Sequence, residues 1–141
     1  MRTSISARLL MLLVAALLAR VSFGTYKPGK AAQINYYTDS ACRNYVGEAA
    51  EWWTTKGPEI TECMSLNMPH NAQSINTAAI WKPDGTPYCG KCIFYEAAGC
   101  GSGQFEVSSY SPYTGQCLSA RTVGAATLWQ SAKCSVESNA C

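Results

Sequence analysis

Two stretches of the 141-residue sequence share one pattern, Ile34-Asn-Tyr-Tyr-Thr-Asp-Ser-Ala-Cys42 and Ile93-Phe-Tyr-Glu-Ala-Ala-Gly-Cys100. Each contains an aromatic residue followed by Tyr-x4-Cys, so the aromatic residue and the tyrosine would point to opposite faces of a strand. A Gln-Ser pair follows later in both cases, at Gln73-Ser74 and Gln130-Ser131. The repeat predicts two units of about 50 residues, each of a few strands, that pack face to face to bury their aromatic sides.

The sequence around these stretches is typical of a mostly β fold. Turn residues separate short strand-like runs, and the one helix candidate, residues 48–56, is stopped by Gly57-Pro58. From residue 25 onward the chain has only three leucines but 14 aromatic residues, a composition that suits half-buried strands better than a helical bundle. The expected strands are residues 33–37, 45–46, 77–81, 92–96, 104–107 and 127–130.

The first 24 residues have the pattern of a secretory signal peptide. Arg2 and Arg8 precede an apolar run at residues 9–19, and small residues follow, with a cleavage site expected before Thr25. The apolar run is too short to span a bilayer. Removing this segment takes away three arginines and changes the formal net charge from +2 to −1. We therefore expect a single secreted domain at residues 25–141 that binds no nucleic acid, because it offers phosphate little attraction.

Eight cysteines, all after residue 24, predict four disulfides in a small exported domain. Their connectivity stays open. A zinc site is the alternative, but there is only one Cys-x-x-Cys pair, Cys89-Gly-Lys-Cys92, and the one histidine, His70, is distant in sequence. A redox role for that pair would need a helix after it, whereas a strand-like run follows. The disulfide candidates are Cys42, Cys63, Cys89, Cys92, Cys100, Cys117, Cys134 and Cys141.

The two repeated stretches resemble the Greek-key motif of βγ-crystallin domains. In that family an aromatic residue in the first strand is followed by a folded-over hairpin, which a later serine anchors; Ser74 and Ser131 match that serine. Cysteine stands where the family has a large residue, at Cys42 and Cys100, and a disulfide there would tie down the hairpin. The family's glycine, which needs positive φ, is replaced by Asn44 and Ser102. The resemblance implies two Greek-key-like motifs packed as a βγ-crystallin-like sandwich.

The resemblance also implies candidate functions. A short leader before a cysteine-rich chain of this size is similar to small secreted proteins of filamentous fungi, some of which have crystallin-like folds and act as effectors on a host; related folds include killer toxins and a proteinase inhibitor. Many βγ-crystallin domains bind calcium, and the matching window supplies Asn71 and Ser74. No carboxylate stands in that window, whereas calcium prefers carboxylate-rich sites, so we expect no cofactor.

Binding is a better expectation than catalysis for this sequence. His70 lies in a loop-like run, no serine occupies a nucleophile elbow, and the scattered acidic residues define no catalytic pair, so no catalytic residue is assigned. Trp52-Trp53 cannot both enter one core, because neighbouring residues point in different directions. The exposed one would stack on a sugar ring or anchor a protein partner. Tyr110 and Tyr113, in a turn-rich run, are further binding candidates.

The sequence thus predicts a monomeric secreted effector or toxin-like binding protein, acting on a host or competitor protein or on a surface glycan. The alternatives are a carbohydrate-binding or cell-wall-associated structural protein and a small secreted hydrolase.

Overall fold

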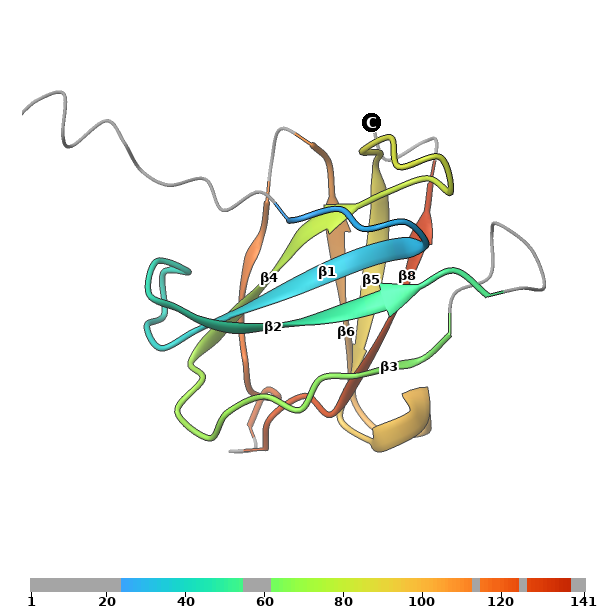
Figure 1. The fold of residues 1–141 in the computed structure, drawn as a ribbon. Coiled ribbons are helices and arrows are strands. Elements are labelled where there is room, and N and C mark those ends of the chain that lie inside the picture. Colours follow the sequence, from blue (N-terminus) through green and yellow to red (C-terminus); the bar gives the residue numbers. More distant parts are fainter. Residues whose placement is uncertain (1–23, 55–61, 113–114, 125–126, 138–141) are drawn as a thin grey trace, which may run out of the picture.

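The fold is described for residues 24–54, 62–112, 115–124 and 127–137 of a computed structural model. Within these ranges the chain forms strands and one short 3-10 turn, η1 (Ala98–Cys100), but no α-helix (Figure 1). The mostly β prediction is therefore confirmed. The strands are β1 (Lys30–Tyr37), β2 (Tyr45–Trp52), β3 (Met64–Ser65), β4 (Ser74–Ile80), β5 (Gly90–Tyr95), β6 (Phe105–Tyr110), β7 (Cys117–Ser119) and β8 (Ser131–Val136).

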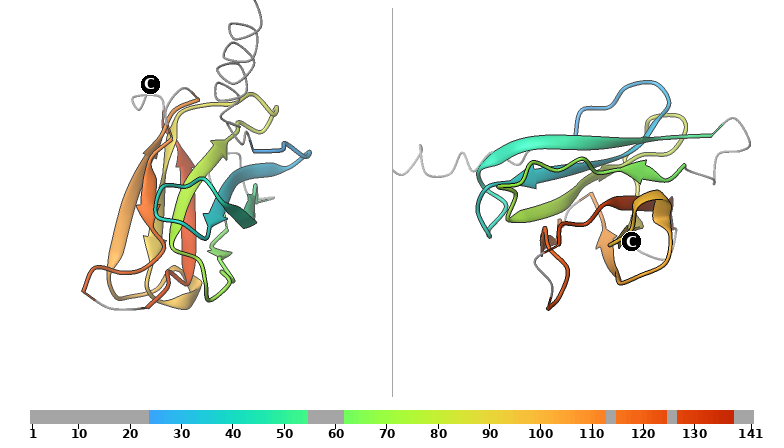
Figure 2. Two further views of the ribbon diagram at one scale, coloured as in Figure 1. Left: turned by 90° about the vertical axis from the view of Figure 1, so that its left-hand side faces the viewer. Right: turned by 90° about the horizontal axis from the view of Figure 1, so that it is seen from below.

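The strands form two antiparallel sheets that lie against each other as two layers (Figure 2). Sheet 1 has the order β2-β1-β4-β7, and sheet 2 has the order β3-β8-β5-β6. We call β1–β4 the first half of the chain and β5–β8 the second half. Three strands of each half share a sheet, and the remaining short strand, β3 or β7, pairs in the sheet of the other half. The halves are therefore interlocked rather than merely packed.

Alternating residues of the strands point between the sheets and form the core. Ile34 and Tyr36 of β1, Ile75 of β4 and Phe94 of β5 are each at most 2% exposed. Tyr36 and Phe94 are the aromatic residues that precede the repeated tyrosines, and both belong to this core as the pattern predicts. The Tyr36 hydroxyl donates a hydrogen bond to the carbonyl oxygen of Leu66. Burial raises the pKa of Tyr36, so its hydroxyl stays a donor.

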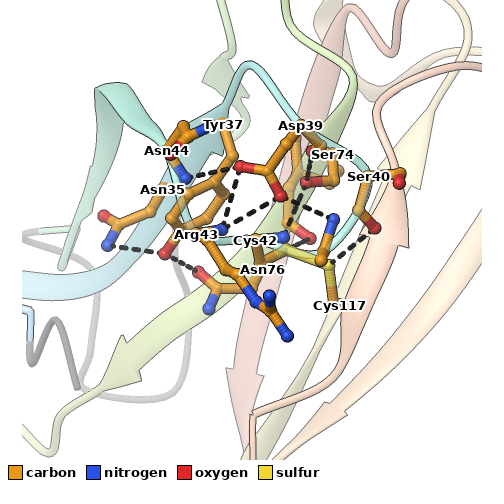
Figure 3. The surroundings of a disulfide bond; sticks show 12 residues. Asn35, Tyr37, Asp39, Ser40, Cys42, Arg43, Asn44, Ser74, Asn76 and Cys117 are labelled. Carbon is orange, nitrogen blue, oxygen red and sulfur yellow. Dashed lines mark hydrogen bonds between the residues drawn. A yellow bond between two sulfur atoms is a disulfide. The ribbon is translucent and has the colours of Figure 1, made fainter. Parts of the chain in front are cut away.

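A serine holds the hairpin after β1 against the sheet (Figure 3). The buried Ser74 donates from Oγ to the carbonyl oxygen of Asp39 (2.5 Å) and accepts from the backbone N–H of Cys42 (3.2 Å). The Asp39 carboxylate accepts hydrogen bonds from three backbone N–H groups of the same hairpin. The bond from the N–H of Asn44 is the main cause that holds the pKa of Asp39 below its ordinary value.

The second half repeats this clamp atom for atom. Ser131 donates from Oγ to the carbonyl oxygen of Ala97 (2.6 Å) and accepts from the backbone N–H of Cys100 (2.9 Å). Cys42 and Cys100 also share a left-handed backbone, with φ of 54° in both. The family pattern has its glycine at the positions of Asn44 and Ser102, but the positive φ lies at Cys42 and Cys100 and, in the second half, also at the nearby Gly99 and Gly103. The internal repetition seen in the sequence is thus present in the hydrogen bonding.

Three disulfides join described residues, Cys42–Cys117, Cys63–Cys100 and Cys92–Cys134. The first two are equivalent, because each ties the hairpin of one half to the exchanged strand of the other or to the residue just before it. The third joins β5 to β8 within sheet 2. Cys89 is also disulfide-bonded, and Cys141 lies outside the described residues.

Two local predictions are wrong. Residues 48–52 of the expected helix belong to strand β2, with residues 55 and 56 outside the described ranges. The strand expected at residues 127–130 makes only an isolated bridge, Arg121 with Leu128, and the regular strand is β8 directly after it. Strands β3 and β7 were not predicted. The other expected strands overlap β1, β2, β4, β5 and β6.

Candidate functional site

The outer face of sheet 1 carries a connected row of polar side chains along β1 and β4, which we call the polar ladder: Lys30, Gln33, Asn35, Tyr37 and Asn76. Gln33 Nε2 donates to Asn35 Oδ1 (2.7 Å), Asn35 Nδ2 to the Tyr37 hydroxyl (3.4 Å), and that hydroxyl to Asn76 Oδ1 (3.2 Å). Although these side chains face away from the core, Gln33, Asn35 and Tyr37 are at most 3% exposed. Mutual hydrogen bonding offsets the cost of burying them.

Glu48 of β2 connects the polar ladder to the edge of the sheet. Its Oε2 accepts hydrogen bonds from Gln33 Nε2 (2.9 Å) and from the Tyr45 hydroxyl (3.0 Å), and its Oε1 lies 3.6 Å from Lys30 Nζ. Lys30 is 2% exposed. Burial lowers the pKa of Lys30, and the Glu48 carboxylate opposes that shift. Lys30 Nζ also donates to the carbonyl oxygen of Thr25 (3.0 Å), so residues before β1 cover this end of the ladder.

Two exposed aromatic side chains stand on the same strand and face as Glu48. Tyr45 is 51% exposed and Trp52 is 46% exposed. Tyr45 pairs with Tyr37 across the strands, and Trp52 pairs with Lys30, so both lie on the ladder side of the sheet. We call Tyr45, Glu48 and Trp52 the β2 strip.

The outer face of sheet 2 has an apolar area along β5 and β6, with Lys91 and Lys133 on the same face beside it. Phe105 and Val107 of β6 are 65% and 46% exposed, and they pair with the partly exposed Tyr95 and Ile93 of β5. We call these four side chains the apolar face. β6 has a partner strand on one side only among the described residues.

Phe105 also borders an open depression of about 640 Å³. Its other walls include Val123, which is 81% exposed, and Trp129, which is buried and donates from Nε1 to the carbonyl oxygen of Ser119 (3.1 Å). Gln104 and Glu106 also line the depression, so its surface is mixed rather than purely apolar.

Strand register shows how the two faces correspond. Tyr37 pairs with Tyr45 in sheet 1, as Tyr95 pairs with Phe105 in sheet 2. Asn35 pairs with Glu48, as Ile93 pairs with Val107. The positions of Asn35 and Glu48 in the first half thus hold the apolar Ile93 and Val107 in the second half, whereas the positions of Gln33 and Asn76 hold lysines, Lys91 and Lys133.

The four predicted binding residues have different surroundings. Trp52 is exposed, as one tryptophan of the pair was expected to be, whereas Trp53 is partly buried and its Nε1 is a buried donor without a hydrogen-bond partner among the described residues. Tyr110 is 7% exposed and belongs to the core, which leaves its ring little surface for a partner. Tyr113 lies outside the described residues.

The weak calcium candidates do not come together as a ligand set. Asn71 is exposed, and the Ser74 hydroxyl is occupied by the hairpin clamp. Across the described part of the chain, no three His, Cys, Asp or Glu side chains group in a way that could hold a metal ion.

Sequence reasoning did not identify Phe105, Val107, Tyr45 or Glu48 as surface candidates. The alternation in Phe105-Glu-Val107 predicts a strand with one apolar side. It does not show whether that side faces the core or solvent.

No helix within the described ranges is long and apolar enough to cross a membrane. Comparisons of the chain with protein-family models, curated proteins and solved structures give no match.

Proposed function

We propose that the two halves are Greek-key motifs of the βγ-crystallin type. Two features support this proposal: the return of β4 beside β1 after β3 has paired in the other sheet, and the repeated serine clamp over a folded hairpin. The large residue of the family motif is replaced by a cysteine in each half, and both cysteines are used in disulfides. In the proposed sandwich, disulfides thus occupy the positions where the family relies on the packing of a large side chain.

The protein is proposed to work outside the producing cell. The disulfides among the described residues support this, because such bonds persist in oxidising compartments. The signal-peptide pattern supports it from the sequence, with residues 1–23 outside the described ranges.

Its proposed activity is binding, as an effector or toxin-like protein that engages a protein of a host or competitor. The apolar face is the observation that carries this proposal. Phe105 and Val107 remain exposed, and the equivalent positions in sheet 1 hold Tyr45, which has a hydroxyl group, and Glu48, so the fold itself does not require a purely apolar side chain at either position. Burying such a side chain against a partner contributes about 1.5–3 kcal/mol, which is the contribution of an interface hot spot.

The test compares residues 25–141 with a variant carrying Phe105→Ser and Val107→Ser, infiltrated into host tissue and applied to competing microbes. We expect the response to require at least a tenfold higher dose of the variant, because two anchors are lost. The matched control is Val46→Ser, which removes an apolar side chain that is 38% exposed on sheet 1. A variant that stays folded and acts at the wild-type dose would rule out the apolar face as the binding surface.

A further inference from the structure

We propose that the β2 strip binds a linear, uncharged polysaccharide. This site lies on sheet 1, on the side of the sandwich opposite to the apolar face. It can be tested independently of the proposed protein target.

The first argument is the placement of the aromatic side chains. Tyr45 and Trp52 stand on one face of one strand, with a register shift near Tyr45 that brings its ring onto the ladder side. At roughly 3.3 Å per residue, the seven steps from Tyr45 to Trp52 correspond to at most about 23 Å along the strand. Flat aromatic rings with a polar edge pack against the C–H faces of sugars while their own polar groups stay solvated. Two such rings in a line suit a ligand that extends along the strand.

The second argument is the hydrogen-bonding group between the rings. The Glu48 side chain is 39% exposed, and its carboxylate has acceptor positions beyond those that Gln33 and Tyr45 occupy. Those same two contacts hold it in place, so little conformational freedom is lost when a hydroxyl group binds. A fixed carboxylate between two rings matches a sugar chain, which presents hydroxyl groups at its edges and C–H groups on its faces.

The third argument is charge, and it selects an uncharged glycan. The exposed members of the β2 strip offer a carboxylate and no cation, and Lys30, the cation beside Glu48, is buried and paired with it. A polyanion would be repelled by the Glu48 carboxylate at the centre of the strip, and the exposed cation near it, Lys27, lies toward the Trp52 end, where its charge also acts on Lys30. An apolar protein surface would have to desolvate the same carboxylate, which costs several kcal/mol if it is left without new partners. A neutral chain of hydroxyl groups avoids both costs.

The experiment measures retention of residues 25–141 on three insoluble neutral polysaccharides, chitin, cellulose and β-1,3-glucan, and on an anionic one, polygalacturonate. We expect retention on at least one neutral polymer that does not weaken in 0.5 M NaCl, since charge attraction does not drive it. The double variant Tyr45→Ala and Trp52→Ala should reduce the association constant at least tenfold. Trp52→Tyr, which keeps an aromatic ring, should restore most of the loss caused by Trp52→Ala.

Two controls separate this site from the apolar face. The Phe105→Ser, Val107→Ser variant should bind the polysaccharide as the wild type does, and its dose response in tissue or microbes reports on the protein target alone. Thermal unfolding confirms that each variant is folded. The inference is overturned if the wild type is retained on none of the neutral polymers, if it prefers polygalacturonate, or if the folded double variant binds as tightly as the wild type.

Discussion

At the scale of single residues, two serine hydroxyls determine how the hairpins lie. Ser74 and Ser131 each donate to one backbone carbonyl and accept from one backbone N–H of the hairpin above them. Both serines are at most 1% exposed, so water cannot replace these bonds without opening the hairpin. The stability that each serine contributes therefore depends on the backbone N–H and carbonyl groups that its removal would leave without a hydrogen bond.

Replacing either serine by alanine should lower the free energy of unfolding by about 1–3 kcal/mol, because a partly buried N–H and a partly buried carbonyl lose their partner. Urea denaturation with the disulfides intact measures the loss for Ser74→Ala and Ser131→Ala. The control is Ser109→Ala, an exposed position on β6, where a change below about 0.5 kcal/mol is expected. If only one of the two clamp variants were destabilised, the two hairpins would not be equivalent.

The cysteines of the two hairpins show where residue-level prediction failed. The resembling family has a left-handed glycine at the positions of Asn44 and Ser102, but here Cys42 and Cys100 are left-handed, which no feature of the sequence predicts. Such a conformation costs a non-glycine residue about 1 kcal/mol or more. The serine clamp and the disulfide act at that same residue in each hairpin and hold it there. The backbone preference of a single residue does not reveal restraints that come from residues distant in sequence.

At the scale of elements, two disulfides link the hairpin of one half to the exchanged strand of the other half or to the residue just before it. Cys42–Cys117 closes 75 residues and Cys63–Cys100 closes 37. Removing either pair by a double Cys→Ala change should cost about 2–4 kcal/mol. The pair with the longer separation should cost about 0.6 kcal/mol more, since its loop is twice as long.

Guanidinium denaturation of the two double variants, beside a third lacking Cys92 and Cys134, checks this ordering. The third pair lies within one sheet and closes 42 residues, so its removal reports on loop closure without the link between halves. A midpoint that does not fall when Cys42 and Cys117 are replaced would show that this restraint does not contribute to stability.

Strand β2 explains why an expected helix is absent. Glu48-Ala-Ala-Glu51 is rich in good helix formers, which motivated the helix prediction. In the structure Ala49 packs against the core and Glu51 accepts from the backbone N–H of Cys134 (2.9 Å), while Glu48 faces outward. Pairing with β1 along the whole strand outweighs the small differences in intrinsic propensity.

Strands β3, β7 and β8 could not be predicted because their sequences carry too little hydrophobic pattern. β8 contains Ala132 and Cys134 where a typical buried strand has large β-branched residues, so its hydrophobic signal is weak. β3 and β7 have only two and three residues, too few for any periodicity. The pattern that was predicted best, Tyr-x4-Cys with a later serine, succeeded because it encodes specific contacts.

The candidate site was predictable in part. An exposed tryptophan in the Trp52-Trp53 pair followed from strand geometry. The apolar face did not, because in β6 the buried side is Ser108 and Tyr110 while Phe105 and Val107 face solvent. Apolar residues normally mark the buried side of a strand, so a binding surface of this kind looks like core in the sequence.

At the scale of the whole molecule, the exchange of β3 and β7 makes each half dependent on the other. Separate fragments of residues 25–81 and 82–141 should therefore not fold. Each would lack one strand of its sheet and the cysteine partners across the halves. Narrow amide dispersion in 1H–15N NMR spectra of each fragment is the expected result. A well-dispersed spectrum from either fragment alone would show that the halves are autonomous.

The exchanged strands also set the order of events during synthesis. Sheet 1 includes β7 (Cys117–Ser119), and sheet 2 includes β8 (Ser131–Val136). Neither sheet can therefore be completed while only the first half of the chain has left the ribosome. A chain of which only the first half has been made lacks β7 and the Cys117 partner of Cys42. The proposed export, which requires a chain that has not yet folded to cross a membrane, is compatible with this late closure of the fold.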